Sequence, residues 1–218
     1  MTTSLNIDFV SDVSCPWCAI GLAALKTALA RLDGVVTADI CCQPFELNPH
    51  MVAQGEPTEE HLQRKYGSTP EQASAIRETI RARGAAVGFT FNMDKRTRIY
   101  NTFDAHRLLH WSRAQGRQLA LKQALFTAYF TDGLDPSNHM VLLDVAQSVG
   151  LDRSAAQAVL QSDAYAADVR EEEQFFLQHG IQSVPAVIVN RRHLISGGQP
   201  PEVFEQALRQ IAAQAGAA

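Results

Sequence analysis

The chain has 218 residues, 46% of them apolar and 19% charged, a composition typical of a globular protein with a substantial core. Its 19 basic and 23 acidic residues give a net charge of −4, which favours neither a nucleic-acid nor a membrane-surface partner. No apolar run approaches the ~20 residues of a membrane span, and the segment "MTTSLNIDFV" lacks the features of a secretory signal. With only four cysteines the chain is not a disulfide-stapled mini-protein, and we expect a cytoplasmic protein.

The N-terminal part is typical of a β–α–β unit. Apolar and polar residues alternate from Leu5 to Phe9, which predicts a half-buried strand. Residues 16–31 are rich in alanine and leucine and begin with a proline, which is favoured in the first turn of a helix. A second β-rich run covers residues 35–47 and breaks at Pro44.

The long segment after Pro57 has the character of successive helices. The stretches "TEEHLQRKYG" and "STPEQASAIRETIRARG" each combine a Thr or Ser cap, acids in the first turn and a terminal glycine. Further helices are predicted at 102–115, 118–131, 138–149 and 153–178. Within the last of these, the run "REEEQ" from Arg170 to Gln174 is interpreted as a solvated helix face.

The β pattern returns with "SVPAVIVN", Ser183 to Asn190. The following "RR" predicts a turn into a second short strand, "HLISGG", although Arg-Arg is poor chemistry for a two-residue hairpin turn. A last helix begins at Pro200 or Pro201. This order predicts one domain from residues 1–56 and 180–218, with residues 57–179 as an inserted helical subdomain.

The most informative motif is "CPWC", in which Cys15 and Cys18 stand where the first strand gives way to the first helix. Residues three apart share a helix face, at a spacing that a disulfide can bridge. At the cap position, Cys15 would gain thiolate character from the unpaired N–H groups and the helix dipole. Cys18 would lie one turn inside. The asymmetry suits one attacking and one resolving thiol.

Two other interpretations of the pair are structural thiols and half of a zinc site. A structural zinc site needs four ligands, and the chain has no second C-x-x-C. Cys41 and Cys42 are adjacent, so in a strand they point to opposite faces. We interpret them as ordinary strand residues, and a redox-sensing role for them stays open.

Several motifs occur in the order found in one family. These are "CPWC", "PFELNP", "NTFDAHRLLH", "ALFTAYF", "SVPAVIVN" and "SGGQP". On these motifs the chain, from about Ile7 to Leu208, resembles the DsbA-like thioredoxin-fold superfamily and its FrnE-like branch of cytoplasmic disulfide oxidoreductases. The resemblance implies an α/β thioredoxin fold, βαβ and ββα around a mixed sheet, with a large all-helical insertion.

The resemblance also implies an activity, in which Cys15 and Cys18 exchange a disulfide with protein or peptide thiols. Glutathione is an alternative co-substrate, and neither an organic cofactor nor a metal is needed for the exchange. Pro16 and Trp17, between the cysteines, are expected to contact the substrate. The direction of exchange, the physiological substrate, and the choice between monomer and homodimer stay open.

A second set of site residues follows from the same resemblance. It implies a cis bond between Val184 and Pro185, against the trans default for X–Pro bonds, in a loop facing the redox pair. The backbone groups of Val184 would then be free to pair with an extended substrate. Asn101 and His106 belong to "NTFDAHRLL", a segment that the family places over the pair, and are further candidates.

Two polar features have competing explanations. Asp12 precedes Cys15 by three residues: near the thiolate it would oppose ionisation, but a strand-end residue pointing to water is the simpler expectation. His106 and His110 have the i, i+4 spacing of metal ligands, yet no motif completes the set, so we favour helix packing and surface exposure.

Two rival functions also remain. The first is a glutathione-dependent isomerase or transferase of the same fold, of the 2-hydroxychromene-2-carboxylate isomerase or kappa-class type, which typically carries serine at one or both of the cysteine positions. The second is a non-catalytic binding or chaperone-like protein. The intact C-x-x-C favours dithiol–disulfide exchange over both.

Overall fold

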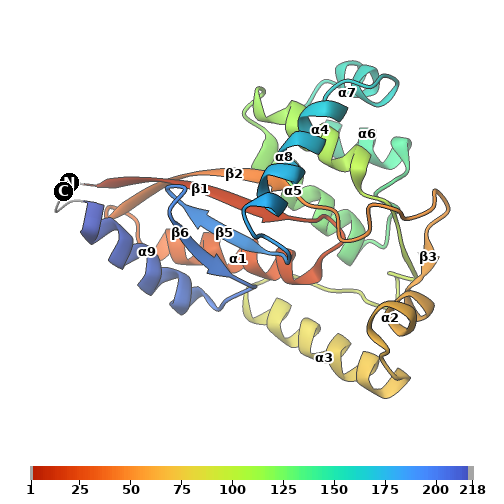
Figure 1. Cartoon of the computed structure of the whole chain (residues 1–218), viewed down its shortest axis with the longest axis horizontal. Helices are drawn as coiled ribbons and strands as arrows, with labels where there is room; N and C mark the ends of the chain where they lie inside the picture. The colour runs from red at the N-terminus through yellow and green to blue at the C-terminus, as the bar shows by residue number, and fades with distance from the viewer. Residues whose placement is uncertain (1, 216–218) are drawn as a thin grey trace.

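The structure, a computed structural model, describes residues 2–215 and is built around a four-stranded mixed sheet (Figure 1). Its strands lie in the order β2 (Val36–Pro44), β1 (Thr3–Ser11), β5 (Ala186–Val189) and β6 (His193–Ser196). β1 and β2 are parallel, whereas β5 is antiparallel to both of its neighbours. The predicted βαβ and ββα halves therefore share one sheet, and the predicted fold class is confirmed.

Two helices cover one face of this sheet. They are α1 (Pro16–Arg31), between the parallel strands, and α9 (Pro201–Ala215), after the hairpin. The inward side chains of β1, Leu5, Ile7 and Phe9, pack with both helices in the largest hydrophobic cluster. The alternation predicted for β1 is thus confirmed, and α1 starts just after the carboxyl end of β1.

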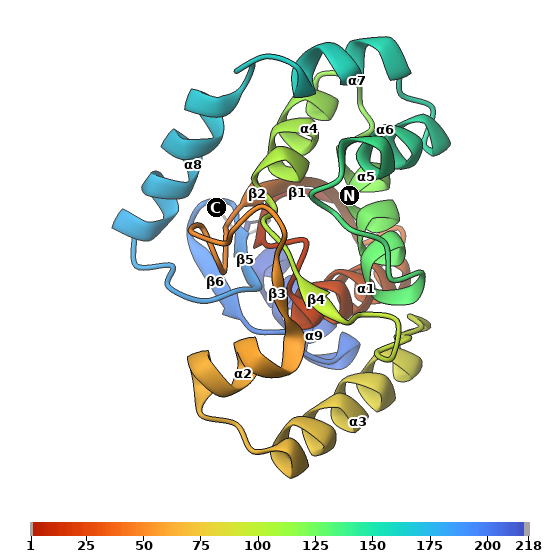
Figure 2. The ribbon, with the colours of Figure 1, turned by 90° about the vertical axis from the view of Figure 1, so that its right-hand side faces the viewer.

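The segment between β2 and β5 forms two groups of elements on different sides of the sheet's end (Figure 2). The first group is β3 (Glu56–Pro57), α2 (Thr58–Tyr66), α3 (Pro70–Ala86) and β4 (Arg98–Ile99). The second group is α4 (Phe103–Arg113), α5 (Gln118–Phe126), η1 (Thr127–Thr131), α6 (His139–Ser148), α7 (Arg153–Leu160) and α8 (Ala166–Gln178). Strands β3 and β4 pair as a small antiparallel sheet. No helix within residues 2–215 is long and apolar enough to cross a bilayer.

Helix boundaries follow local chemistry, with three departures from expectation. The predicted helix 153–178 is two helices, because Tyr165 adopts a left-handed conformation with φ of 61° between them. The predicted helix 118–131 ends in a π-helical turn, residues 127–131. Thr69 caps α3 through a capping box as predicted, but Thr58 does not cap α2: its hydroxyl bonds the Arg96 carbonyl instead.

The hairpin between β5 and β6 turns one residue earlier than predicted. Asn190 and Arg191 have φ values of 53° and 54°, and the Arg192 N–H bonds the Val189 carbonyl at 3.1 Å. This is a turn with two left-handed central residues, for which asparagine is well suited. Asn190 therefore takes the first central position of the turn, and a single arginine, Arg191, takes the second.

Candidate active site

The two cysteines of the C-x-x-C motif lie at the start of α1. Cys15 is the N-cap residue, with extended backbone angles, and Pro16 opens the helix. The Cys15 N–H bonds the Asp12 carbonyl at 3.2 Å, and the Cys18 N–H bonds the Cys15 carbonyl at 3.1 Å. Both are thiols in this structure; Cys15 faces a cleft, whereas Cys18 has no exposed surface. The positions agree with one accessible thiol and one shielded behind it.

The loop before β5 forms the opposite wall beside Cys15. The Val184–Pro185 peptide bond is cis, as the resemblance implied. The Cys15 thiol lies 3.7 Å from the Val184 carbonyl oxygen, to which it can donate a hydrogen bond. The main chain at Val184 therefore contacts the Cys15 sulfur directly.

Glycine allows the chain to approach α1 closely on this side. A Cβ at Gly198 would lie 2.8 Å from the Trp17 carbonyl oxygen, and one at Gly21 would lie 3.1 Å from the Pro185 ring. Arg83, on α3, donates a hydrogen bond of 2.7 Å to the Gly198 carbonyl and places its guanidinium 5.9 Å from the Trp17 ring centroid. The "SGGQP" segment thus fixes the first turn of α1 by backbone contact.

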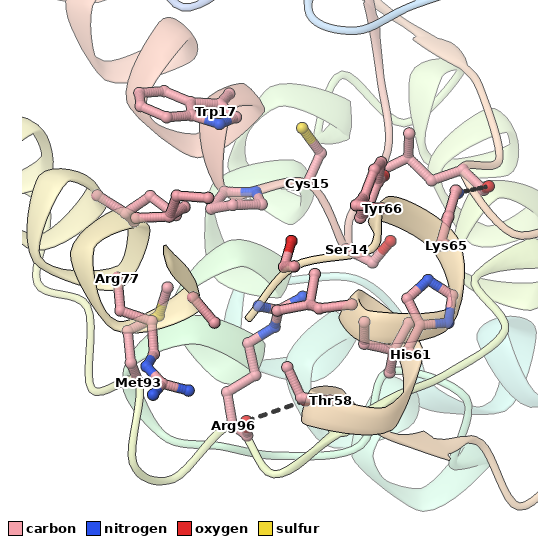
Figure 3. Close-up of a pocket in the computed structure, with 18 of the residues that line it drawn as sticks. Ser14, Cys15, Trp17, Thr58, His61, Lys65, Tyr66, Arg77, Met93 and Arg96 are labelled. Carbon is pink, nitrogen blue, oxygen red and sulfur yellow. Dashed lines mark hydrogen bonds between the residues drawn. The ribbon is translucent and has the colours of Figure 1, made fainter. Parts of the chain in front are cut away.

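A cleft of about 1260 Å³ opens over the Cys15 side of the pair (Figure 3). Trp17 and Cys15 lie on the upper side of the cleft, Tyr66 lies beside Cys15 in this view, and Arg96 reaches in from below (Figure 3). Its lining comes from residues 14–17, residues 45–48, α2, α3, residues 93–97 and residues 182–184. Among the candidates from sequence, Cys15, Pro16, Trp17 and Val184 line this cleft.

Lys65 connects the α2 wall to the loop that follows β2. Its ammonium donates hydrogen bonds to the Leu47 carbonyl at 2.7 Å and to Asn48 Oδ1 at 2.8 Å.

The Arg96 guanidinium lies over the Tyr129 ring, 5.1 Å from its centroid, and no acidic side chain within residues 2–215 pairs with it at ion-pair distance. The cleft is therefore lined by the Arg96 cation and the Tyr66 ring as well as by Cys15.

Asp12 is a buried organising residue of the site. Its carboxylate accepts hydrogen bonds from the Ser14 N–H at 3.0 Å, the Ser14 hydroxyl at 2.9 Å and the Leu47 N–H at 2.7 Å. Burial alone would raise the Asp12 pKa, but His106 and these donors outweigh burial and lower the pKa to about 2. The expectation that Asp12 points to water is wrong, because the start of α1 folds its side chain inwards to satisfy loop N–H groups.

The two remaining candidates, Asn101 and His106, are not among the residues that line the cleft. His106 is buried behind it, with Nε2 3.7 Å from Asp12 Oδ1. The Asn101 side chain accepts from the Phe103 N–H at 2.8 Å, where it starts α4, and its amide lies 3.4 Å from Glu46. His110 is separate, beside Glu172 at 3.2 Å, so the two histidines have different partners.

The run Arg170 to Gln174 is a solvated face only in part: Glu171 and Gln174 are exposed, but Glu173 is buried. Arg170 bonds the carboxylate of Glu46 and, at 2.7 Å, that of Glu173. Its guanidinium stacks on the Phe103 ring at 3.8 Å. Both carboxylates are almost fully buried, so this arginine connects α8 to the cleft wall at Glu46. Only the packing of α8 against the strand ends brings these residues together.

The other thiols are unfavourable nucleophiles. Burial, and then the contact with Cys15, raise the Cys18 pKa well above its usual range. Burial also raises the pKa of Cys41 to about 12 and of Cys42 to about 11. Gln118 holds the main chain of Cys42 through two hydrogen bonds, 2.9 and 3.0 Å long. Cys41 and Cys42 therefore behave as strand residues, as the sequence analysis favoured.

Sequence reasoning missed several residues of this region. Tyr66 and Arg96 reach the cleft through the fold of the insertion. The role of Glu46 depends on its contact with Arg170, which is distant in sequence. Lys122 is different, because "LALKQALF" carries a lysine between apolar residues and that residue is fully buried. A lysine on an apolar helix face is a signal that was present in the sequence.

Comparison with known proteins decides the family. The model of the "DSBA-like thioredoxin domain" matches residues 6–209. The chain belongs to the DSBA-like thioredoxin domain family. It is similar to a probable DsbA oxidoreductase from Streptomyces coelicolor, with 36% identity, a TM-score of 0.87 and coverage of 94% of this chain and 89% of that one.

Three further similar proteins are more distant in sequence. YwbO of Bacillus subtilis (strain 168) is 23% identical over 207 residues, covering 94% of this chain and 96% of that protein. The cytosolic disulfide reductase DsbM of Pseudomonas aeruginosa, in a structure with GSH, has a TM-score of 0.66 at 17% identity, over 94% of this chain and 98% of that one. A 2-hydroxychromene-2-carboxylate isomerase has a TM-score of 0.69 at 16% identity, over 97% and 98%. These two show the shared fold alone.

Proposed function

We propose that this DsbA-like protein is a thiol–disulfide oxidoreductase in which Cys15 attacks and Cys18 resolves. The observation that supports it is the pairing of two thiols in one helical turn, one lining a cleft against the Val184 carbonyl and the other wholly buried. Cys15 stands at the N-terminus of α1, where unpaired N–H groups and the helix dipole make a favourable environment for an anion.

The exchange proceeds in two balanced steps. The Cys15 thiolate attacks one sulfur of a substrate disulfide, forms a mixed disulfide and releases the other half as a thiolate. Cys18 then loses its proton and attacks the Cys15 sulfur, which expels the second substrate thiolate. The substrate gains two electrons and the Cys15–Cys18 disulfide forms. The reverse sequence oxidises a substrate dithiol.

The residues around Cys15 have separate roles in this proposal. Trp17 and Tyr66 offer flat surfaces on two sides of the cleft, and the Val184 main chain offers hydrogen-bonding groups to an extended peptide. A protein or peptide thiol and glutathione both remain co-substrates under this proposal. The DsbM structure with GSH supports including glutathione, and the cytosolic description of DsbM supports a cytoplasmic site of action.

Single cysteine variants test the assignment. Cys15→Ser is expected to abolish exchange with an insulin or dithiol-peptide substrate, whereas Cys18→Ser is expected to accumulate the mixed disulfide, detected by mass spectrometry. Cys41→Ser is the matched control and should exchange like the parent. Unchanged turnover in Cys15→Ser would contradict the assignment of the nucleophile.

The rival isomerase or transferase makes the opposite prediction. Such an enzyme would bind glutathione tightly and keep its activity when either thiol is replaced. Glutathione-dependent activity, measured on the parent and on both serine variants, separates the two functions, because only the rival keeps its activity when a thiol is replaced. A binding or chaperone-like protein would show no redox turnover in the parent.

A further inference from the structure

Lys122 has no part in the mechanism above, and its burial calls for an explanation. It lies on α5 with no exposed surface, and its ammonium donates a hydrogen bond to the Ser11 carbonyl at 3.3 Å. The nitrogen lies 5.1 Å from the centroid of the Phe126 ring. Within residues 2–215 no acidic side chain pairs with it at ion-pair distance. Burying a cation without an anionic partner costs folding free energy, so a lysine in this position is rare unless its charge stabilises another group.

The position of Lys122 follows from the stripe it shares with two neighbours. Gln118, Lys122 and Phe126 are four residues apart and therefore lie on one face of α5. Gln118 clamps the Cys42 main chain on β2, while Lys122 bonds the last residue of β1. This face of α5 thus lies against the carboxyl ends of the parallel strands, where the chain turns into the redox motif.

Only a few residues separate that contact from the thiols. The residue after Ser11 is Asp12, whose carbonyl accepts the Cys15 N–H at 3.2 Å. Phe126, under the Lys122 nitrogen, belongs to the same buried cluster as Cys18. Lys122 therefore lies at the carboxyl end of β1, against the main chain that leads into the C-x-x-C motif.

Four ionisable groups face Lys122: Asp12 from the loop, Cys15 and Cys18 from α1, and Cys42 from β2. His106, on α4, reaches the same place through Asp12. Burial lowers the Lys122 pKa, and negative charge on these four groups raises it. In return, the Lys122 charge lowers the pKa of Cys18, against the larger effect of burial. The Asp12 carboxylate already accepts three hydrogen bonds from the loop and does not form an ion pair with Lys122. The Lys122 charge is therefore available to a Cys18 thiolate.

We propose that Lys122 is a positioning residue for the resolving step, in which its buried ammonium stabilises the Cys18 thiolate that attacks the mixed disulfide. This inference rests on the proposed function. Cys18 loses its proton, its sulfur bonds to that of Cys15, and the bond between Cys15 and the substrate breaks; the proton lost from Cys18 balances the one that the leaving thiolate takes up. The leaving thiolate carries away the electron pair and takes up a proton. Lys122 keeps its own proton and supplies charge only.

The test separates attack from resolution in the whole protein. The probe is 5,5′-dithiobis(2-nitrobenzoate), which releases one coloured thiolate when Cys15 attacks and a second when Cys18 resolves. In Lys122→Met we expect the second release to slow about tenfold near neutral pH and its pH profile to move up by about one unit, because losing the charge raises the Cys18 pKa. The first release should change less than the second.

Lys26→Met is the matched control, because it removes an exposed lysine from α1 itself. It should behave as the parent, and Lys122→Arg, which keeps the charge, should recover the parent's pH profile. Equal slowing of both releases with an unshifted profile would mean a structural role and would overturn the inference. No thiolate release from the parent would instead refute the proposed function itself.

A measurement on the unaltered protein covers the case in which Lys122→Met does not fold. In protein with ¹³Cε-labelled lysine, the Lys122 signal is titrated in the reduced and the oxidised state, with Lys26 as internal reference. We expect the Lys122 pKa to be higher in the reduced protein, which can carry a thiolate beside it. The same Lys122 pKa in both states would overturn the inference.

Discussion

The carboxylate of Asp12 lies 3.7 Å from Nε2 of His106, and both side chains are almost fully buried behind the redox pair. Asp12 also bonds the main chain at Ser14 and Leu47. One carboxylate therefore joins the first turn of the redox motif, the loop after β2 and helix α4. The stability of the site depends on keeping that carboxylate ionised.

Stability should fall in acid because of Asp12. Its folded-state pKa of about 2 lies below the usual 3.8, so the ionised form contributes stability above about pH 4 that is lost as the pH falls towards 2. The contribution is about 2 kcal/mol. Urea unfolding at a series of pH values from about 2.5 to about 7 measures this loss. The free energy of unfolding should change less with pH in Asp12→Asn than in the parent. The exposed Asp39→Asn is the control, and a parent-like slope in Asp12→Asn would contradict this role.

Removing Arg170 should be costly. Arg170→Met leaves Glu46 and Glu173 buried side by side without their shared cation, a loss of about 3 kcal/mol or more at neutral pH. Because burial already raises the Glu173 pKa, acidification should recover part of the loss as the carboxylates take up protons. Denaturant unfolding at pH 5 and 7.5 measures both effects.

Arg153→Met provides the contrast for Arg170. Its partner Asp144 is 69% exposed, so the change should cost below about 0.5 kcal/mol. Equal costs for the two arginine variants would mean that the Glu46–Arg170–Glu173 network does not contribute to stability.

The close approach at Gly198 should be needed for exchange. Gly198→Ala places a Cβ against the Trp17 carbonyl, so the first turn of α1 must shift and the variant should lose about 1–3 kcal/mol. Its exchange rate should fall with it. In Gly34→Ala the new Cβ meets no heavy atom within 4 Å, although φ of 76° strains the backbone by about 1–2 kcal/mol. That control should lose stability and keep the parent's exchange rate.

Alkylation of the reduced protein should follow access and ionisation of the thiols. Cys15 lines the cleft, whereas burial raises the pKa of Cys18, Cys41 and Cys42. We expect iodoacetamide at neutral pH to label Cys15 first, as read by peptide mass spectrometry over time. Denatured protein, in which all four thiols react alike, is the reference, and early labelling of Cys18 would contradict the assignment of roles.

Much of the fold could be predicted from local patterns. Alternation from Leu5 to Phe9 and a proline at the start of residues 16–31 indicate β1 and α1, because strand burial and helix capping depend on neighbours in sequence. The break at Tyr165 could not be predicted, because a left-handed tyrosine leaves no local signal. The position of Asn190 in the turn was available from its preference for that conformation but was overlooked.

The order of the elements and the position of Cys15 and Cys18 at a helix start follow from local sequence, since spacing and capping are properties of adjacent residues. Which distant residues surround the pair depends on tertiary packing. Asp12 contacts His106, Glu46 contacts Arg170, and Lys122 contacts the end of β1. These residues are far apart in sequence, and the periodicity of apolar residues does not predict such contacts. Such contacts depend on how helices pack on the sheet. The buried charges behind Cys18 are therefore a property of the fold rather than of the motif.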